Sequence, residues 1–307
     1  MLRAFLASLS AATLLAGGPA PAADETYTLK LYQGKKGDKT EHEKTAEGKG
    51  AFFIKGTKDD QEVAGEEKEV YTEEILEKNP GERKPAKLTR TYSVSESTNR
   101  VKTAKTPYAG ETVFIEKKGN KYVFGLKDKV LKAAEVPDLD GEFNIADAPS
   151  NEDLLPKVAV KVGERWKVPA EIRAKVYATY GGGLLLDVAP LPWDKKEVKD
   201  PSKIAAEKSS VVGKLAKVYK KDGAQFGVVE ITTTMNVTHL MFGLAKAKEG
   251  SKIVLKHRLD TCLDGTSPVE DSVLEMEWDI EAEMPGGQAI VLSQRSRHTE
   301  KTRVVPK

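Results

Sequence analysis

Histidines are the side chains of this sequence best suited to acid–base chemistry near neutral pH, and the chain has four: His42, His239, His257 and His298. No two of them have the spacing of metal ligands on one helix, such as His-x-x-x-His. His257 shares its parity with apolar neighbours in an alternating segment, which favours a packed histidine. A hydrolase would need His257 or His298 beside a carboxylate in one pocket, and the sequence leaves that alternative open.

A partial calcium-loop pattern follows in the region of the single cysteine. Asp260, Asp264 and Gly265 fit the first, fifth and sixth loop positions, but Cys262 occupies the third and Asp271 the twelfth, where Glu is usual. A hairpin turn explains the same residues, so we predict no metal site. We interpret Cys262 as a small buried hydrophobic residue rather than a nucleophile or an intermolecular crosslink.

The usual motifs of nucleophilic and phosphate chemistry are absent from the sequence, which has no Gly-x-Ser-x-Gly and no phosphate-binding loop. Acidic residues do alternate from Glu275 to Glu283, but a catalytic carboxylate pair needs a concave site that separates the two pKa values. A row of carboxylates along one strand is more typical of a solvated face. We therefore predict no catalytic residue, no enzyme activity and no cofactor.

The elements that position these residues show the two-residue period of β-strands. From Val273 to Met284, apolar residues occupy one parity and acidic residues the other, which predicts a strand with one dry and one wet face. A following strand over 289–305 carries basic residues on one parity. In an antiparallel pair, the numbers of opposed residues have a constant sum, and an odd-length loop makes that sum even. We predict this even-sum register, because it pairs Glu277 with Arg295 or Arg297.

The same alternation predicts further strands. Lys252–Cys262 should complete a three-stranded meander with the two strands above, and Asp222–Gly223 and Gly119–Asn120 should turn two more hairpins. Residues 34–48 are almost wholly polar, and we expect a mobile loop or a solvated hairpin there. Helix is scarce, and two segments are ambiguous between helix and strand: Glu66–Lys78 and Pro169–Tyr180.

These segments predict a mainly β fold with little helix, in which long antiparallel meander strands form a curved open sheet, a half-barrel or a sandwich. Residues 1–23 have the basic start, apolar run and small-residue end of a signal peptide, with cleavage expected after Ala22 or Ala23. We expect an N-terminal β-rich half over 24–148, a linker over 149–157 and a C-terminal β-rich half over 158–307.

Acidic and basic side chains are nearly balanced over the whole chain. The 49 Lys and Arg residues stand against 47 Asp and Glu residues, for a formal net charge of +2. Such a balance gives no long-range attraction to nucleic acid or to anionic lipid. We therefore expect no nucleic-acid partner. No segment after the signal peptide is apolar enough to cross a membrane, so we also expect no transmembrane segment in the mature chain.

One short motif carries a family resemblance. Val162, Gly163, Glu164, Arg165 and Trp166 form a Val-Gly-Glu-Arg-Trp stretch. It resembles a strand signature of uncharacterised exported β-rich domains of the bacterial envelope, and the segment Leu215–Ile231 is similar to the hairpin that follows it there. The resemblance implies an envelope address and no known activity. An edge turn anchored by one Trp is an alternative reading of the same residues.

We predict an exported, non-catalytic binding or carrier protein of the bacterial periplasm, with an apolar small molecule as its ligand. Long two-faced strands and the lack of catalytic motifs motivate this prediction. The alternatives are a structural or protein-interaction module of the cell envelope, with an envelope protein as partner, and, third, a hydrolase. The candidate lining residues are Trp166, Trp193, Trp278, Met276 and Met284.

Overall fold

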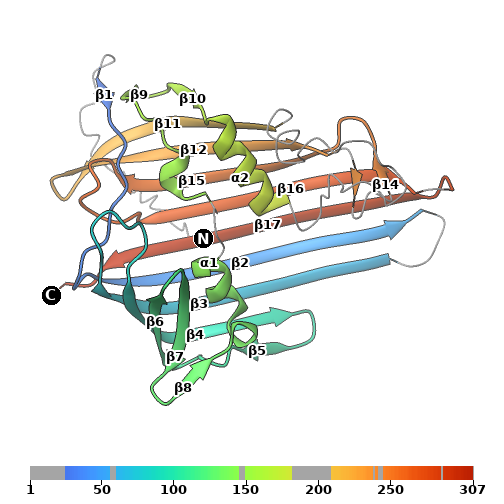
Figure 1. Ribbon diagram of the computed structural model, residues 1–307. Helices are drawn as coiled ribbons and strands as arrows, with labels where there is room; N and C mark the ends of the chain where they lie inside the picture. The colour runs from blue at the N-terminus through green and yellow to red at the C-terminus, as the bar shows by residue number, and fades with distance from the viewer. Residues whose placement is uncertain are drawn as a thin grey trace, which may run out of the picture.

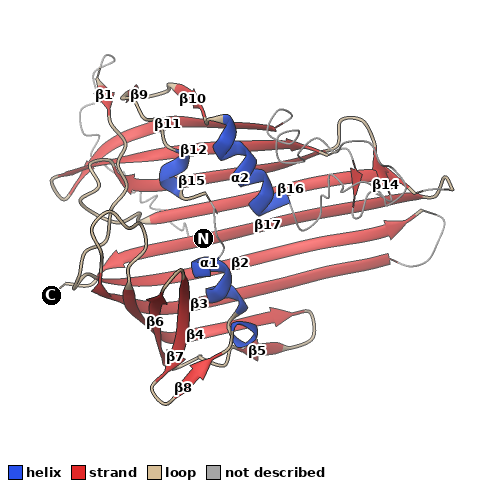
Figure 2. Cartoon of the chain, viewed as in Figure 1, coloured by secondary structure: helices blue, strands red, loops and turns tan. Residues whose placement is uncertain are grey.

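The computed structural model describes residues 25–55, 60–144, 149–181, 209–237, 239–240, 245–284 and 286–306. The expected signal peptide (1–23) and Trp193 lie outside the described residues. The described chain forms one large antiparallel sheet that is not closed, with two α-helices, so the predicted mainly β class is confirmed. Figure 2 shows how strongly strand dominates. None of the described helices is long and apolar enough to span a membrane.

The main path of the sheet starts with strands from the C-terminal half of the chain and ends with strands from the N-terminal half. In spatial order, the strands are β10 (Arg165–Lys167), β11 (Ser209–Lys221), β12 (Ala224–Asn236), β15 (Lys252–Cys262), β16 (Asp271–Glu283), β17 (Ala289–Val304), β2 (Lys39–Ile54), β3 (Asp60–Glu77), β4 (Lys87–Asn99), β6 (Thr112–Lys118), β7 (Lys121–Leu126) and β8 (Lys129–Leu131).

Smaller elements lie beside this path. β5 (Thr103–Lys105) pairs with β4, while β13 (His239–Leu240) pairs with β14 (Ala245–Ala247), which in turn pairs with β16. β1 (Thr26–Tyr27) and β9 (Val160–Lys161) form a separate two-stranded sheet. The helices are α1 (Pro137–Asn144) and α2 (Ala170–Gly181), together with the 3-10 helices η1 (Ala133–Glu135) and η2 (Asn151–Leu154).

The last long strand, β17, pairs with the first long strand, β2, from Ile290–Ile54 to Val304–Thr40. Both halves of the chain therefore contribute to one continuous sheet, which Figure 1 shows as red and blue strands side by side. The expected linker, 149–157, contains η2 and lies outside this sheet. Whether the two halves are separate folding units stays a prediction.

The predicted register of the C-terminal meander is confirmed. Glu277 pairs with Arg295 and Glu275 pairs with Arg297, which is the even-sum register. Glu283 is the last paired residue of β16 and meets Ala289, so the odd-length stretch 284–288 joins the strands. The acidic and basic rows thus face each other on one side of the sheet, and the apolar rows coincide on the other.

Both predicted two-residue hairpins are also confirmed. Lys221 pairs with Ala224 across Asp222–Gly223, whose φ angles are 49° and 80°. Positive φ at both central residues is the type I′ geometry that matches the twist of the flanking strands. Lys118 pairs with Lys121 across Gly119–Asn120, where Gly119 has a φ of 61° and Asn120 has no positive φ, as in a type II′ turn.

Of the two alternatives for 34–48, a mobile loop or a solvated hairpin, the loop is wrong for most of the segment, because β2 begins at Lys39 and pairs with β3. Polar composition suggested solvent, but β2 lies between β17 and β3, so hydrogen bonds to both neighbours hold its backbone extended. The two ambiguous segments resolve differently. Residues 66–77 belong to the long strand β3, and residues 170–181 form α2.

The buried side chains form three clusters on the sheet rather than one. Val176 and Ile172 of α2 pack into the first cluster, over β11 and β12. Leu139 and Phe143 of α1 pack into the second, over β4, β6 and β7. Figure 1 shows both helices in front of the same face of the sheet. The third cluster lies where β15 and β17 begin and where β16 ends. The centre of the face lies between the three clusters.

Candidate functional site

The candidate site lies on the helix-bearing face, where residues in register form rows across the central strands. The middle row runs from Met276 on β16 through Ser296, Gly48 and Gly65 to Asn99 on β4. Since opposed residues of a pleated sheet point to the same side, this row places small side chains together. Because glycine and serine side chains fill little space, the register produces a depression in the sheet surface along this row.

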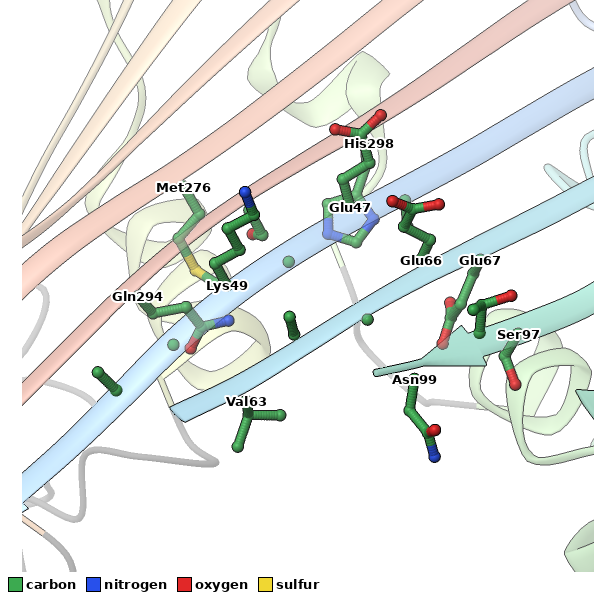
Figure 3. Close-up of a pocket in the computed structure, with 18 of the residues that line it drawn as sticks. Glu47, Lys49, Val63, Glu66, Glu67, Ser97, Asn99, Met276, Gln294 and His298 are labelled. Carbon is green, nitrogen blue, oxygen red and sulfur yellow. The ribbon is translucent and has the colours of Figure 1, made fainter. Parts of the chain in front are cut away.

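This depression is a hollow of about 650 Å³, a size typical of a site for one small ligand. Figure 3 shows Met276 and Gln294 on one side of it and Ser97 and Asn99 on the other, with β2 and β3 between them. Its lining is apolar toward one end and polar toward the other. The apolar contributors are Ala46, Gly48, Gly50, Ala51, Phe52, Val63, Ala64, Gly65, Ala104, Met276 and Trp278.

Two glycines form the floor of the hollow although the backbone does not require them. Neither Gly48 nor Gly65 has a positive φ angle. A Cβ on Gly48 would come no closer than 3.9 Å to Ser296 Cβ, and one on Gly65 no closer than 3.5 Å to the Thr98 carbonyl oxygen. A glycine inside a strand is destabilising by about 0.5–1 kcal/mol relative to alanine. Their effect here is to keep the hollow open, as where a ligand approaches the backbone closely.

A second hollow of about 670 Å³ adjoins the first on the same face, and most of the side chains that line it are polar or charged. The two share lining residues, so they form one continuous concavity, which we call the central groove: Ala46, Glu67, Ser97, Met276, Ser296 and His298 line both. Its polar end adds side chains from seven elements: Lys44, Glu69, Ser95, Asp138, Glu142, His257, Ser272 and Glu300.

A buried ion-pair network fixes α1 beside this polar end. The Arg90 side chain is only 4% exposed and donates to Glu73 at 2.9 Å and to both oxygens of Glu142 at 2.9 and 2.5 Å. Its guanidinium stacks on Tyr71, 4.6 Å from the ring centre. Burial alone would raise the pKa of Glu142, but the charges of Arg90 and Lys44 hold it well below its ordinary value. Glu142 therefore stays ionised and keeps α1 attached to the sheet.

His257 and Ser272 form the one contact in the groove that resembles a base and a nucleophile. The His257 Nε2 atom lies 2.9 Å from Ser272 Oγ. Burial lowers the pKa of His257 to about 4, so the imidazole is neutral at neutral pH. His257, His298 and Glu300 all line the second hollow, where Glu300 pairs with His42 at 3.0 Å and with Lys44 at 3.9 Å. In the described part of the chain, however, no carboxylate bonds to the second nitrogen of His257.

The predicted lining residues occupy three different places. Met276 and Trp278 line the central groove, where Trp278 is also a buried member of the third cluster and Met276 packs against that cluster. Met284 packs against the third buried cluster at the end of β16. Trp166 lies in the first cluster, where its Nε1 donates to the Leu154 carbonyl at 2.9 Å. The Trp in the Val-Gly-Glu-Arg-Trp stretch thus anchors the sheet edge.

Sequence reasoning missed the small and charged residues of the groove. None of Gly48, Gly65, Ser296, Lys44 and Glu67 is singled out by the sequence, and only Lys44 and Gly48 lie in the polar segment 34–48. Glycines inside a strongly alternating segment were the available signal, because strand interiors disfavour glycine. Only the β17–β2–β3 register shows that these residues share one surface.

No family model matches the chain, and no curated protein matches it. Among solved structures, a DUF1329 family protein from Desulfovibrio piger is similar over 82% of this chain and 83% of that chain, at 6% sequence identity and a TM-score of 0.12. A likeness this low carries no weight for fold or function.

Proposed function

We propose that this chain is an exported, non-catalytic binding or carrier protein of the bacterial periplasm, which holds a ligand with an apolar part in the central groove. The observation that carries the proposal is the glycine floor of the groove. Gly48 and Gly65 keep space open where a packed sheet would place side chains, and nothing in the described chain fills it.

The walls of the groove fit this role. Trp278, Met276 and Phe52 provide apolar surface at one end, and Phe52 and Met276 remain partly exposed there. Contiguous apolar surface rimmed by polar side chains is typical of ligand-binding sites. The opposite face of the sheet has a hollow of about 620 Å³ as well, but its walls are charged and pair across strands, as in Arg295 with Glu277 at 2.9 Å.

The first test is native mass spectrometry of the mature protein, secreted with its own signal peptide and purified without detergent. We expect a mass above that of the bare chain and a small molecule with an apolar part in the organic extract. A bare mass together with no uptake of a fluorescent apolar probe, N-phenyl-1-naphthylamine, would contradict the binding function and favour an interaction module of the envelope.

A matched pair of variants locates the site. Gly65→Leu places a bulky side chain in the groove, whereas Thr72→Leu, at a position of opposite parity in β3 that lines neither hollow, places the same side chain on the other face. We expect the first to abolish probe uptake and the second to retain it. Equal uptake by both variants would place binding elsewhere.

A hydrolase is the second candidate, and the His257–Ser272 contact is the specific observation that favours it. Its test is the release of p-nitrophenol from p-nitrophenyl esters of short and long acids. Turnover that disappears in Ser272→Ala would establish it, and no turnover above that of Ser272→Ala would leave the groove as a binding site.

A further inference from the structure

The first hollow has two polar walls on opposite sides of its floor. Gln294 and His298 of β17 form one wall, and Ser97 and Asn99 of β4 form the other (Figure 3). Each of the four opposes a residue of β2 or β3 that also lines the hollow, so the register places all of them on the helix-bearing face. Side chains stand roughly perpendicular to a sheet, and the two walls therefore border one space.

The width of this space can be worked out from the strand order. β2 and β3 lie between β17 and β4, so three steps from strand to strand separate the walls. At about 4.8 Å a step, the walls are roughly 14 Å apart. A hydrogen bond takes up about 3 Å at each wall, so an occupant that reaches both walls has polar atoms about 8 Å apart. One sugar ring is narrower than this span, and two linked rings can cover it.

The walls offer hydrogen bonds that the protein itself does not use. Three of the four side chains, all except that of Asn99, make no hydrogen bond to another residue in the described chain. Asn99 Oδ1 accepts from the backbone N–H groups of Val101 at 3.1 Å and Lys102 at 2.9 Å, which holds this side chain in place. Amide, hydroxyl and imidazole groups together donate and accept hydrogen bonds. A sugar hydroxyl also does both, so it can bond to either wall.

Charge in the first hollow selects neither a cationic nor an anionic head group. Of the charged side chains that line it, Glu47, Lys49 and Glu66 have the parity of the opposite face. The other two, Glu67 and Lys102, have opposite signs. A neutral head group with many hydrogen-bonding atoms fits this lining better than an ammonium or a carboxylate.

The apolar part of the ligand has its own place along β2. The inner face of this strand changes from Phe52 through Gly50 and Gly48 to Lys44. Phe52 packs against the third buried cluster and remains partly exposed in the hollow, as does Met276. An alkyl chain that lies toward Phe52 therefore leaves the polar part of the same molecule between the two walls.

We propose that the ligand is a neutral amphiphile with a sugar head, which lies between the two polar walls while its alkyl chain lies toward Phe52. This inference rests on the proposed binding function and specifies its ligand class. The hollow of about 650 Å³ and the span between the walls suit a head of one or two rings. An ether head accepts hydrogen bonds but donates few, so it satisfies the walls less completely.

The test compares four amphiphiles with the same decyl chain, each below its micellar concentration: decyl maltoside, tetraethylene glycol monodecyl ether, decyltrimethylammonium and decanoate. Each competes with N-phenyl-1-naphthylamine for the mature protein. We expect the maltoside to bind about tenfold more tightly than the ether, as two hydrogen bonds of ordinary strength allow. Neither charged compound should bind more tightly than the maltoside. The preference for maltoside over ether should be the same at low and high salt, because no charge contributes to it.

A double variant removes one hydrogen-bonding side chain from each wall. Gln294→Met/Ser97→Ala should bring the maltoside to within about twofold of the ether, without weakening the ether. The control Gln225→Met/Ser210→Ala makes the same two substitutions in the β11–β12 hairpin, at positions that line neither hollow, and should keep the full preference. Circular dichroism checks that each variant is folded.

The outcomes separate the two proposals. Equal binding of maltoside and ether, tightest binding of a charged amphiphile, or the same preference in the wall variant and its control would overturn the sugar head and leave the binding function intact. If no amphiphile and no probe binds the wild-type protein, the binding function itself fails, and the ligand class fails with it.

Discussion

Replacing Arg90 with methionine tests whether the ion-pair network beside the groove holds α1 on the sheet. The guanidinium lies between Tyr71 and Phe143, with its carbon 4.6 and 5.0 Å from the two ring centres, and it bonds to Glu73 and Glu142. Methionine retains much of the apolar packing but removes every ionic contact. Glu142 is then a carboxylate without its main partner, and the hydrogen bonds that attach α1 to β4 are lost.

The magnitude depends on how deeply each partner is buried. Removing one member of a buried ion pair costs about 3–5 kcal/mol of unfolding free energy. The Arg90 side chain is 4% exposed and that of Glu73 16%, but that of Glu142 is 41% exposed, so water relieves part of the penalty. We therefore expect a loss of about 3 kcal/mol for Arg90→Met, at the lower end of the range for buried pairs. Glu142→Gln should cost less, about 1–2 kcal/mol, because a neutral amide can still accept from Arg90.

Urea unfolding of the mature protein, followed by circular dichroism, measures both losses. The control is Arg295→Met, since the Arg295 side chain is 70% exposed and pairs with Glu277 at 2.9 Å. An exposed pair contributes about 0.2–1 kcal/mol, so the control should stay within that range. If Arg90→Met and Arg295→Met lowered stability equally, the network would not be the attachment that we describe.

Two further changes test the packing around the sheet. Burial lowers the pKa of His257 to about 4 from an ordinary value of 6.5, so below pH 6.5 the unfolded chain binds a proton that the folded chain does not. His257→Gln should therefore reduce the loss of stability between pH 6.5 and 4 by up to about 3 kcal/mol, and urea midpoints that fall equally in both proteins would contradict this. A Cβ on Gly213 would overlap the Trp166 ring, so Gly213→Ala should cost about 1–3 kcal/mol by urea unfolding. Gly48→Ala is its control, because that Cβ has ordinary space, and equal losses in the two variants would show that the Trp166 contact is not what requires glycine.

The β16–β17 pairing shows how much of the fold can be predicted from the sequence. Strict alternation of apolar and acidic residues in β16 sets its two faces, and the basic residues of β17 then allow only registers of one parity. Turn chemistry adds the hairpin at Asp222–Gly223, where both central residues must adopt positive φ. These features are local, and each has a strong energetic preference.

The wrong expectation of a loop over most of 34–48 also has a physical cause in the pattern of side chains. A strand inside a sheet is expected to carry apolar residues on at least one face, but β2 has Lys44, Ala46, Gly48 and Gly50 on its inner face. Those residues line a groove instead of a core, so the pattern that identifies a buried strand is missing. Rules that link sequence to structure tend to fail where a site displaces packing.

Met276 and Trp278 could be predicted as lining residues because large apolar residues on the dry face of a strand face either a core or an apolar cavity. Glu67 and Glu69 could not, because β3 carries acidic residues on both faces and only the pairing with β2 shows which carboxylates face the groove. Their position in the groove depends on pairing between distant segments, which a single sequence does not show.

The distribution of side chains over this one face argues against an incidental gap between cores. Where α1 and α2 cover the sheet, the facing residues are large and apolar, as folding requires. An uncovered surface in water would favour charged or β-branched side chains, which stabilise exposed strands. The middle row has neither: glycine and serine provide no apolar packing and little β-propensity, and they lie between aromatic residues and unpaired carboxylates. Such a row lowers the stability of the free sheet, and the ligand that we propose for the central groove would supply the missing contacts.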